Sequence, residues 1–168
     1  MLTDTLTEVA ISPYRKCDGE SVIRLILSIQ REEMGMTTTP DDQPDLLAIA
    51  DFYHGGASGF WCARQGDEVI GTIALKAFGD NKVALRKMFV AEGFRGKAHG
   101  VASRLLDTAL SWAWQKGADS VWLGTIHSFH AARRFYVKHG FAQVTAEALP
   151  EEFLYMAPDD TFYGKQRP

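Results

Sequence analysis

Apolar residues recur at spacings of three and four along residues 101–116, the pattern of an amphipathic helix with one buried face. These positions are Val101, Ala102, Leu105, Leu106, Ala109, Leu110 and Ala113. Gly117 is expected to end the helix. Apolar runs at 82–90 and 121–126 predict strands on either side of it. The order strand, helix, strand implies a parallel pair of strands with a right-handed crossover.

The remaining pattern predicts an α+β order of elements. Further strands are expected at 9–17, 59–64, 69–77, 141–144 and 153–157, and further helices at 19–34, 44–53 and 131–139. Turn residues at 65–67 and 79–81 predict hairpins on both sides of strand 69–77. For the aromatic C-terminal segment, 148–163, two interpretations stay open: it packs over the last strand, or it closes a pocket or contacts a second subunit.

Length and composition are those of one globular unit. With 168 residues and 46% apolar content, the chain supports one hydrophobic core, so a single domain over 1–168 is expected. Because no apolar stretch approaches 18 residues and the start lacks the features of a signal peptide, we expect a cytoplasmic protein with no membrane partner. A net charge of −3 argues against nucleic acid as a partner. The aromatic residues that look exposed favour a homodimer.

A basic, glycine-containing segment, Arg95-Gly96-Lys97-Ala98-His99-Gly100, separates strand 82–90 from helix 101–116. We call residues 95–100 the anion turn, because the first turn of a helix has unpaired N–H groups and a partial positive charge that attract anions. Its glycines let a phosphate approach the backbone, and its Arg, Lys and His add positive charge. The pattern predicts a site for a compact polyanion. Solvated surface charge is the alternative.

The anion turn, the preceding Met88-Phe89-Val90 and the later run from Phe135 to Phe141 resemble the GNAT superfamily of acetyl-CoA-dependent N-acetyltransferases. This resemblance covers nearly the whole chain. It implies an α/β/α sandwich: a mixed, mostly antiparallel sheet of about seven strands with a parallel splayed pair, and about four helices. The family's phosphate motif, Gln or Arg, two residues, Gly, one residue, and Gly or Ala, is matched by Arg95, Ala98 and Gly100. Ala98 departs from the usual first glycine, and its methyl group narrows the approach of a diphosphate.

The resemblance also implies the reaction. Acetyl-CoA is the expected cosubstrate, and a primary amine of a small molecule or peptide attacks it directly in a ternary complex. In this family the fourth strand bulges and presents backbone groups to the pantetheine arm; here that role falls to Met88, Phe89 and Val90. The backbone from Arg95 to Val101 would then hold the diphosphate. By composition alone, the alternative that these three residues are simply core strand is favoured.

Tyr136 is the candidate general acid. Ala132, Phe135, Tyr136 and His139 share one face of the helix expected at 131–139, which directs the phenol inward. A phenol is protonated at neutral pH and can donate a proton to a departing thiolate. The alternative is a core tyrosine whose hydroxyl finds a backbone partner. Phe129 stands where many relatives carry Asn, so a cofactor contact made by that Asn is in doubt.

The general base is not identified by the sequence. Some members of the family carry a carboxylate on the fifth strand, where this chain has Gly124. Candidates near the expected acceptor pocket are Glu32, Glu33, Asp51 and His54, with water as a further possibility and surface solvation as the alternative fate of each side chain. No metal is expected, because His127 and His130 lack a third ligand at suitable spacing. Because of Gly124, Ala98 and Phe129, a catalytically silent acyl-CoA-binding module stays open as a second function.

Overall fold

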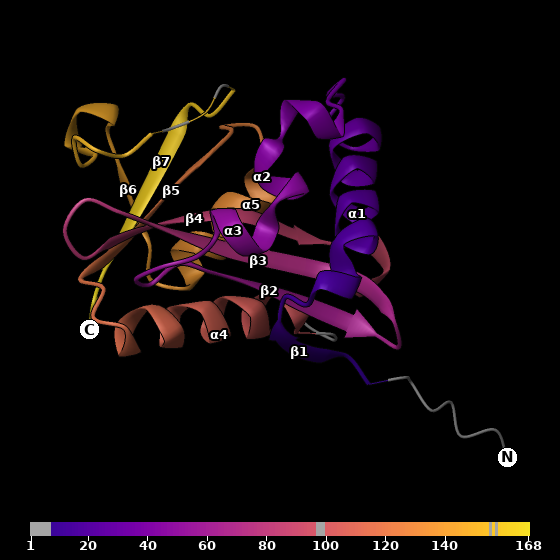
Figure 1. Cartoon of the computed structure of the whole chain (residues 1–168). Helices are drawn as coiled ribbons and strands as arrows, with labels where there is room; N and C mark the ends of the chain where they lie inside the picture. The colour runs from indigo at the N-terminus through magenta and orange to yellow at the C-terminus, as the bar shows by residue number, and fades with distance from the viewer. Residues whose placement is uncertain (1–7, 97–99, 155, 157) are drawn as a thin grey trace, which may run out of the picture.

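The computed structural model describes residues 8–96, 100–154, 156 and 158–168. Within these residues the chain forms a seven-stranded sheet with the order β1-β2-β3-β4-β5-β7-β6 (Figure 1). All neighbouring strands are antiparallel except β4 and β5, which are parallel. The strands are β1 Ala10–Pro13, β2 Gly59–Gln65, β3 Glu68–Phe78, β4 Lys82–Val90, β5 Ser120–Thr125, β6 Ala142–Val144 and β7 Thr161–Gln166.

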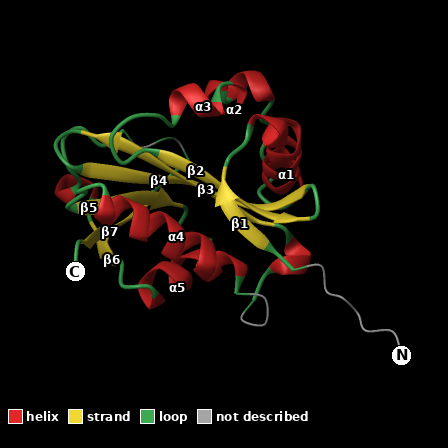
Figure 2. Ribbon diagram, turned by 60° about the horizontal axis from the view of Figure 1, so that its bottom comes forward, coloured by secondary structure: helices red, strands yellow, loops and turns green. Residues whose placement is uncertain are grey.

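Helices cover both faces of the sheet, which confirms the predicted three-layer sandwich (Figure 2). The described residues form five α-helices: α1 Gly19–Glu32, α2 Pro44–Leu47, α3 Ile49–Phe52, α4 Val101–Gln115 and α5 His130–Lys138. Short 3-10 helices lie at Lys16–Asp18, Pro40–Asp42, Glu92–Phe94 and Ala146–Ala148. None of the helices in the described part of the chain has both the length and the apolar character needed to cross a membrane.

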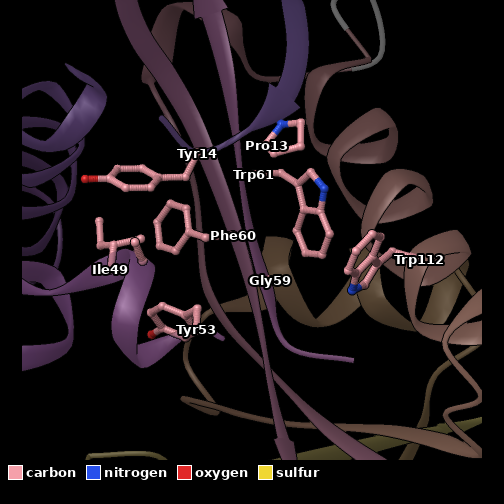
Figure 3. Close-up of a pocket in the computed structure, with 9 residues that line it drawn as sticks. Pro13, Tyr14, Ile49, Tyr53, Gly59, Phe60, Trp61 and Trp112 are labelled. Carbon is pink, nitrogen blue, oxygen red and sulfur yellow. The ribbon is translucent and has the colours of Figure 1, made fainter. Parts of the chain in front are cut away.

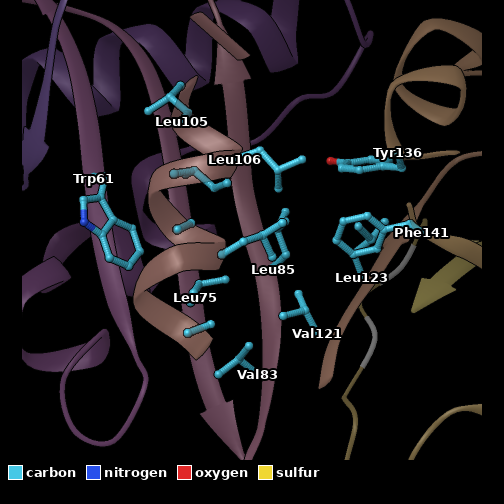
Figure 4. Close-up of a cluster of buried hydrophobic side chains, with 14 of the residues drawn as sticks. Trp61, Leu75, Val83, Leu85, Leu105, Leu106, Val121, Leu123, Tyr136 and Phe141 are labelled. Carbon is cyan, nitrogen blue, oxygen red and sulfur yellow. The ribbon is translucent and has the colours of Figure 1, made fainter. Parts of the chain in front are cut away.

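The core is divided by the sheet into two clusters. The larger one joins the sheet to α4 and α5, and it includes the fully buried Leu105 and Leu106 of α4 (Figure 4). The smaller one packs α1, α2 and α3 on the other face through residues such as Val22, Ile26 and Leu46. Of the apolar positions predicted for residues 101–116, α4 buries all except Ala102, which is half-buried.

The parallel strands β4 and β5 separate after a short paired region. Their pairing runs from Lys82 opposite Ser120 to Ala84 opposite Trp122, whereas the strands continue to Val90 and Thr125. Strand β4 also bulges: Thr72 pairs with Phe89 and Ala74 with Arg86, so two residues of β4 lie opposite a single residue of β3. The predicted splayed pair is confirmed, and the segments of β4 and β5 beyond Ala84 and Trp122, which no longer pair with each other, are called the β4–β5 splay below.

Three predicted elements differ from the structure. The strand expected at 153–157 is wrong: its described residues are not in a strand, and the last strand is β7, whose residues Thr161 to Gly164 are all buried. Since β7 lies between β5 and β6 and is covered on both faces, it has no alternating pattern. The strand expected at 9–17 ends at Pro13. The helix expected at 44–53 is interrupted at Ala48, whose φ of −144° is not helical.

Candidate active site

Tyr136 lies in the larger core cluster, beside the β4–β5 splay. Its side chain is 6% exposed, and its ring packs edge-on against Phe141 at a centroid distance of 5.7 Å. The hydroxyl points from α5 toward β4 (Figure 4), and none of the hydrogen bonds between described residues involves it. Burial, with a smaller contribution from the charge of Asp159, raises the pKa of Tyr136. This phenol is protonated at neutral pH and is available to donate a proton.

The bulge of β4 forms one wall of the splay. Lys87 has a φ of +53°, and its carbonyl accepts a hydrogen bond of 2.6 Å from the Thr72 hydroxyl. Beyond the bulge, Met88 packs against the larger core cluster and Phe89 against the smaller one. The side chains of these two residues, whose backbone groups are predicted to contact the cofactor, thus point to opposite faces of the sheet. The bulge takes Lys87 and Met88 out of the regular ladder to β3, which resumes at Phe89 opposite Thr72.

The anion turn leads directly into α4. Gly96 and Gly100 have φ values of +97° and +60°, a left-handed conformation that favours glycine. A Cβ built on either residue would meet no other atom within 4 Å, so both face open space. The first helical hydrogen bond runs from the Arg104 N–H to the Gly100 carbonyl, so the N–H groups of residues 101–103 have no acceptor within the helix, whereas the Gly100 N–H donates to the Gly96 carbonyl at 3.3 Å. The predicted contacts Lys97, Ala98 and His99 lie outside the described residues.

Arg95 is held away from the open side of this turn. Its guanidinium makes two bonds to the Glu33 carboxylate, at 2.6 and 2.8 Å, and its Nε donates to the Val90 carbonyl at 2.8 Å. The hydrogen-bonded guanidinium holds the pKa of Glu33 below its ordinary value. Sequence reasoning placed Arg95 on a phosphate and Glu33 among the candidate bases. In the structure the Arg95 guanidinium and the Glu33 carboxylate neutralise each other's charge.

The other candidate bases are exposed. Glu32, Asp51 and His54 all lie on the surface, and Glu32 accepts a hydrogen bond from Ser28. The structure instead brings an acidic residue that the sequence analysis did not consider, Asp159, against Gly124 of β5. A Cβ built on Gly124 would lie 2.7 Å from Oδ2 of Asp159. The only sequence signal for this neighbour was the missing side chain at Gly124.

A polar network underlies the bulge on the α1–α3 face. Asp45 is 5% exposed and accepts a hydrogen bond of 2.5 Å from the Tyr53 hydroxyl. The Lys87 ammonium lies 3.6 Å from Asp45 and donates to the Gln43 side-chain oxygen at 2.5 Å. Burial lowers the pKa of Lys87 despite the nearby carboxylate. This network, which no sequence pattern indicated, attaches α2 to the bulge.

An apolar groove of about 230 Å³ lies beside β2, between Ile49 and Tyr53 on one side and Trp61 and Trp112 on the other (Figure 3). The two indole rings meet edge to face at a centroid distance of 5.9 Å. None of the residues that line the groove is acidic or basic, and none is a predicted site residue. The groove therefore contributes no acidic or basic side chain, and the Tyr53 hydroxyl at its edge is already hydrogen-bonded to Asp45.

The described residues contain no cluster of side chains that could bind a metal ion. Within residues 8–96, 100–154, 156 and 158–168, no group of three or more His, Cys, Asp or Glu side chains is arranged to hold an ion. His127 and His130 contact each other edge to face, with ring centroids 6.3 Å apart. Phe129 is half-buried and directly precedes the first residue of α5.

Known proteins share both sequence and fold with this chain. A probable N-acetyltransferase camello from Xenopus tropicalis is 30% identical over 93 residues, which are 54% of this chain and 42% of that protein, so the chain spans less than half the length of this relative. An acetyltransferase of the GNAT family from Staphylococcus aureus is 34% identical, with a TM-score of 0.87 over 94% of this chain and 98% of that one.

A PaiA N-acetyltransferase from Thermoplasma acidophilum, solved with coenzyme A, has a TM-score of 0.71 at 17% identity over 95% of this chain and 99% of that one, and it supports the fold alone. Residues 24–141 match the acetyltransferase (GNAT) family. This match spans the anion turn, the β4–β5 splay and Tyr136. The chain therefore belongs to the acetyltransferase (GNAT) family.

Proposed function

We propose that this chain transfers the acetyl group of acetyl-CoA to a primary amine of a small molecule or peptide, by direct attack in a ternary complex. The observation that carries the proposal is the position of Tyr136: its side chain is buried, and its hydroxyl lacks a hydrogen-bond partner among the described residues and points toward β4 beside the splay. Since no fully buried side-chain oxygen or nitrogen of the described residues lacks a partner, this hydroxyl stays accessible, and a substrate atom in the splay would supply the partner that it lacks.

The described residues fit a diphosphate and a pantetheine arm. Gly96 and Gly100 leave open space at the start of α4, where free N–H groups and the helix dipole favour an anion. In this proposal the backbone from Gly96 to Val101, including Lys97, Ala98 and His99, holds the diphosphate. The backbone of Met88, Phe89 and Val90 lines the path of the arm along the bulge. Arg95 contributes by fixing the turn to α1 rather than by contacting phosphate.

Chemistry follows from the thioester itself, which is already activated toward amines. The amine nitrogen forms a bond to the acetyl carbon and sheds a proton, the carbon–sulfur bond breaks, and coenzyme A leaves as a thiolate. Tyr136 donates its phenolic proton to this sulfur, and the proton shed by the nitrogen returns through water to the tyrosinate. Because the protein mainly positions the two substrates and supplies this proton, no covalent intermediate with the chain is required.

A second candidate function is a catalytically silent acyl-CoA-binding module. It is favoured by Gly124, which places no carboxylate on β5, and by Phe129 at the start of α5. Such a module would bind coenzyme A as tightly as the enzyme does but would release no thiol from acetyl-CoA in the presence of amines. Binding and turnover measured on the same preparation therefore separate the two functions.

The test is calorimetry with coenzyme A and a thiol-release assay with acetyl-CoA and a panel of amino acids, polyamines and short peptides. We expect saturable heat with coenzyme A and thiol release with at least one amine. A Gly100→Val variant, which places a β-branched residue at a φ of +60°, should lose coenzyme A binding. Gly66→Val, at a φ of +61° in the β2–β3 turn, is the control for backbone strain. No heat at millimolar coenzyme A would refute the proposal.

A further inference from the structure

Strand β5 lacks a side chain at Gly124, and the Asp159 side chain fills the space. A Cβ built on Gly124 would lie 2.7 Å from Oδ2 and 3.1 Å from both Cβ and Cγ of Asp159. The φ of Gly124 is not positive, so its backbone conformation is open to other residues. Only the contact with Asp159 excludes a side chain at this position. A carboxylate thus stands beside the fifth strand at the splay, supplied by the segment before β7 rather than by the strand itself.

The backbone around Asp159 is fixed to the end of β5. The Asp160 N–H donates to the Thr125 carbonyl at 3.0 Å, and Oδ1 of Asp160 accepts bonds from the His127 N–H and the Thr161 hydroxyl at 2.8 and 3.0 Å. The Asp159 N–H donates to the Met156 carbonyl at 2.8 Å. Among the hydrogen bonds between described residues, none uses the Asp159 carboxylate. Its oxygens are positioned by the backbone and free to accept a proton.

Asp159 and Tyr136 lie on opposite faces of the sheet at the same splay. Val121 and Leu123 of β5 point into the cluster that contains Tyr136. Because successive side chains of a strand alternate, the Gly124 position faces the other side, where Asp159 lies. The two groups remain close enough that the Asp159 charge raises the pKa of Tyr136. An acetyl carbon in the splay would therefore have a proton donor on one face and a carboxylate on the other.

We propose that Asp159 is the general base of the acetyl transfer and occupies the place that Gly124 leaves open; this inference rests on the proposed function above. An amine that arrives as ammonium loses its first proton to solvent by way of Asp159. When the neutral nitrogen bonds to the acetyl carbon, Asp159 accepts the proton that the nitrogen sheds. The thiolate takes its proton from Tyr136, and the proton held by Asp159 returns through water to the tyrosinate, so the cycle closes.

The surroundings of Asp159 suit this role. Burial and the charge of Asp160 raise its pKa, and the guanidinium of Arg86 lowers it, with a net value of about 6. The titratable and charged groups that act on this carboxylate are Asp160 on its own segment, Arg86 on β4 and Tyr136 on α5. At neutral pH the carboxylate is ionised yet more basic than an ordinary aspartate, as general-base catalysis requires. Turnover should therefore fall as the pH drops through about 6.

The first test compares Asp159→Asn with its neighbour Asp160→Asn. With the panel amine that gives the fastest thiol release, Asp159→Asn should lower kcat by about 10²–10⁴-fold and abolish the acidic limb of the pH profile, with little change in coenzyme A affinity. Asp160→Asn keeps an oxygen for the His127 and Thr161 bonds, so kcat above pH 7 should persist. Its acidic limb should move to lower pH, since a charge that raises the pKa of Asp159 is removed.

The second test moves the carboxylate onto the strand. Gly124→Ala alone should lower kcat, because its Cβ displaces Asp159, and Asp159→Gly alone should lower it further. The double variant Gly124→Asp with Asp159→Gly clears the space and restores a carboxylate, so it should recover part of the lost turnover. A purely structural role for Asp159 predicts no such recovery.

Two results separate this inference from the proposed function. If the unsubstituted chain binds coenzyme A and releases thiol, but Asp159→Asn keeps both kcat and the acidic limb, Asp159 is not the base and the proposed function stands. If the unsubstituted chain neither binds coenzyme A nor turns over acetyl-CoA, the proposed function fails and the assignment of Asp159 fails with it.

Discussion

Arg95 and Glu33 form a two-point ion pair that joins the anion turn to the C-terminal end of α1, with nitrogen–oxygen distances of 2.6 and 2.8 Å. Both side chains are about two fifths exposed. The pair therefore contributes little to overall stability, on the order of 0.2–1 kcal/mol. Its consequence is local: it places a carboxylate beside a turn that otherwise attracts anions.

Removing that carboxylate should strengthen the binding of coenzyme A. In Glu33→Gln, the Arg95 guanidinium is no longer neutralised, so we expect a gain of about 0.2–1 kcal/mol in binding free energy at low salt. The gain should shrink as salt rises, because exposed charges are screened. Calorimetry at two salt concentrations measures it. Glu32→Gln is the matched control, since Glu32 is also exposed and its hydrogen bond is to Ser28. Equal affinities for the two variants would contradict this expectation.

Tyr136→Phe should reduce turnover without disturbing the fold. Its ring contacts with Phe135 and Phe141 are kept, and the lost hydroxyl has no hydrogen-bond partner among the described residues. We expect kcat to fall by about 10²–10⁴-fold, with the coenzyme A affinity and Tm nearly unchanged. Tyr163→Phe is the control: this buried tyrosine accepts a hydrogen bond from Arg133, so its loss should lower Tm rather than kcat. Unchanged turnover in Tyr136→Phe would refute the assignment of the acid.

The sequence predicted those elements of the fold that neighbouring residues mark, and it missed those that only contacts between distant segments define. Residues 82–90 were predicted as a strand with both ends correct, because a glycine turn precedes it and a basic turn follows it. Strand β7 was missed because burial on both faces removes its alternation, and both neighbouring strands precede it along the chain. Only the assembled sheet distinguishes such a strand from an aromatic tail.

The residues of the candidate site likewise fall into those that the sequence predicted and those that it missed. Helix spacing predicted that Tyr136 points inward, and the family resemblance suggested its role; the glycines of the anion turn were placed because a phosphate must approach the backbone closely there. The partner of Arg95 and the neighbour of Gly124 could not, because each contact joins distant parts of the chain. A missing side chain at a strand position is a weak sequence signal, although here it marks the space that Asp159 fills.

Asp18 and Arg64 form a buried ion pair, and its contribution to the free energy of unfolding should depend on pH. Their side chains are 3% and 4% exposed, and Nε of Arg64 lies 2.9 Å from Oδ1 of Asp18. Asp18→Asn leaves a buried cation without its counter-charge, so the free energy of unfolding at pH 7 should fall by about 3–5 kcal/mol. Arg15→Gln, which removes the exposed partner of Asp18, should change it by less than about 1 kcal/mol. Urea titrations measure both effects.

The sign of the pH effect follows from the pKa of Asp18. Its hydrogen bonds to Arg64 hold the folded-state pKa below the ordinary value of 3.8. The pair therefore stabilises the fold above pH 3.8, and this contribution is lost as the pH falls through the lowered folded-state pKa. The difference in unfolding free energy between the unsubstituted chain and Asp18→Asn should shrink over that acidic range. A difference that stays constant there would show that the charge of Asp18 is not responsible.

Gly71 and Leu105 should behave as a coupled pair that sets how closely α4 packs on β3. A Cβ built on Gly71 would lie 3.0 Å from a methyl carbon of Leu105 and 3.3 Å from the Phe89 carbonyl oxygen. Gly71→Ala should therefore cost about 1–3 kcal/mol of unfolding free energy by overpacking. Leu105→Ala, at a fully buried position, should cost about 2–5 kcal/mol through the cavity that it leaves. In the double variant the new methyl group enters that cavity, so urea titration should give a loss smaller than the sum of the single losses; additive losses would mean that the Phe89 carbonyl or the Ala63 Cβ, also 3.3 Å away, limits the space rather than Leu105.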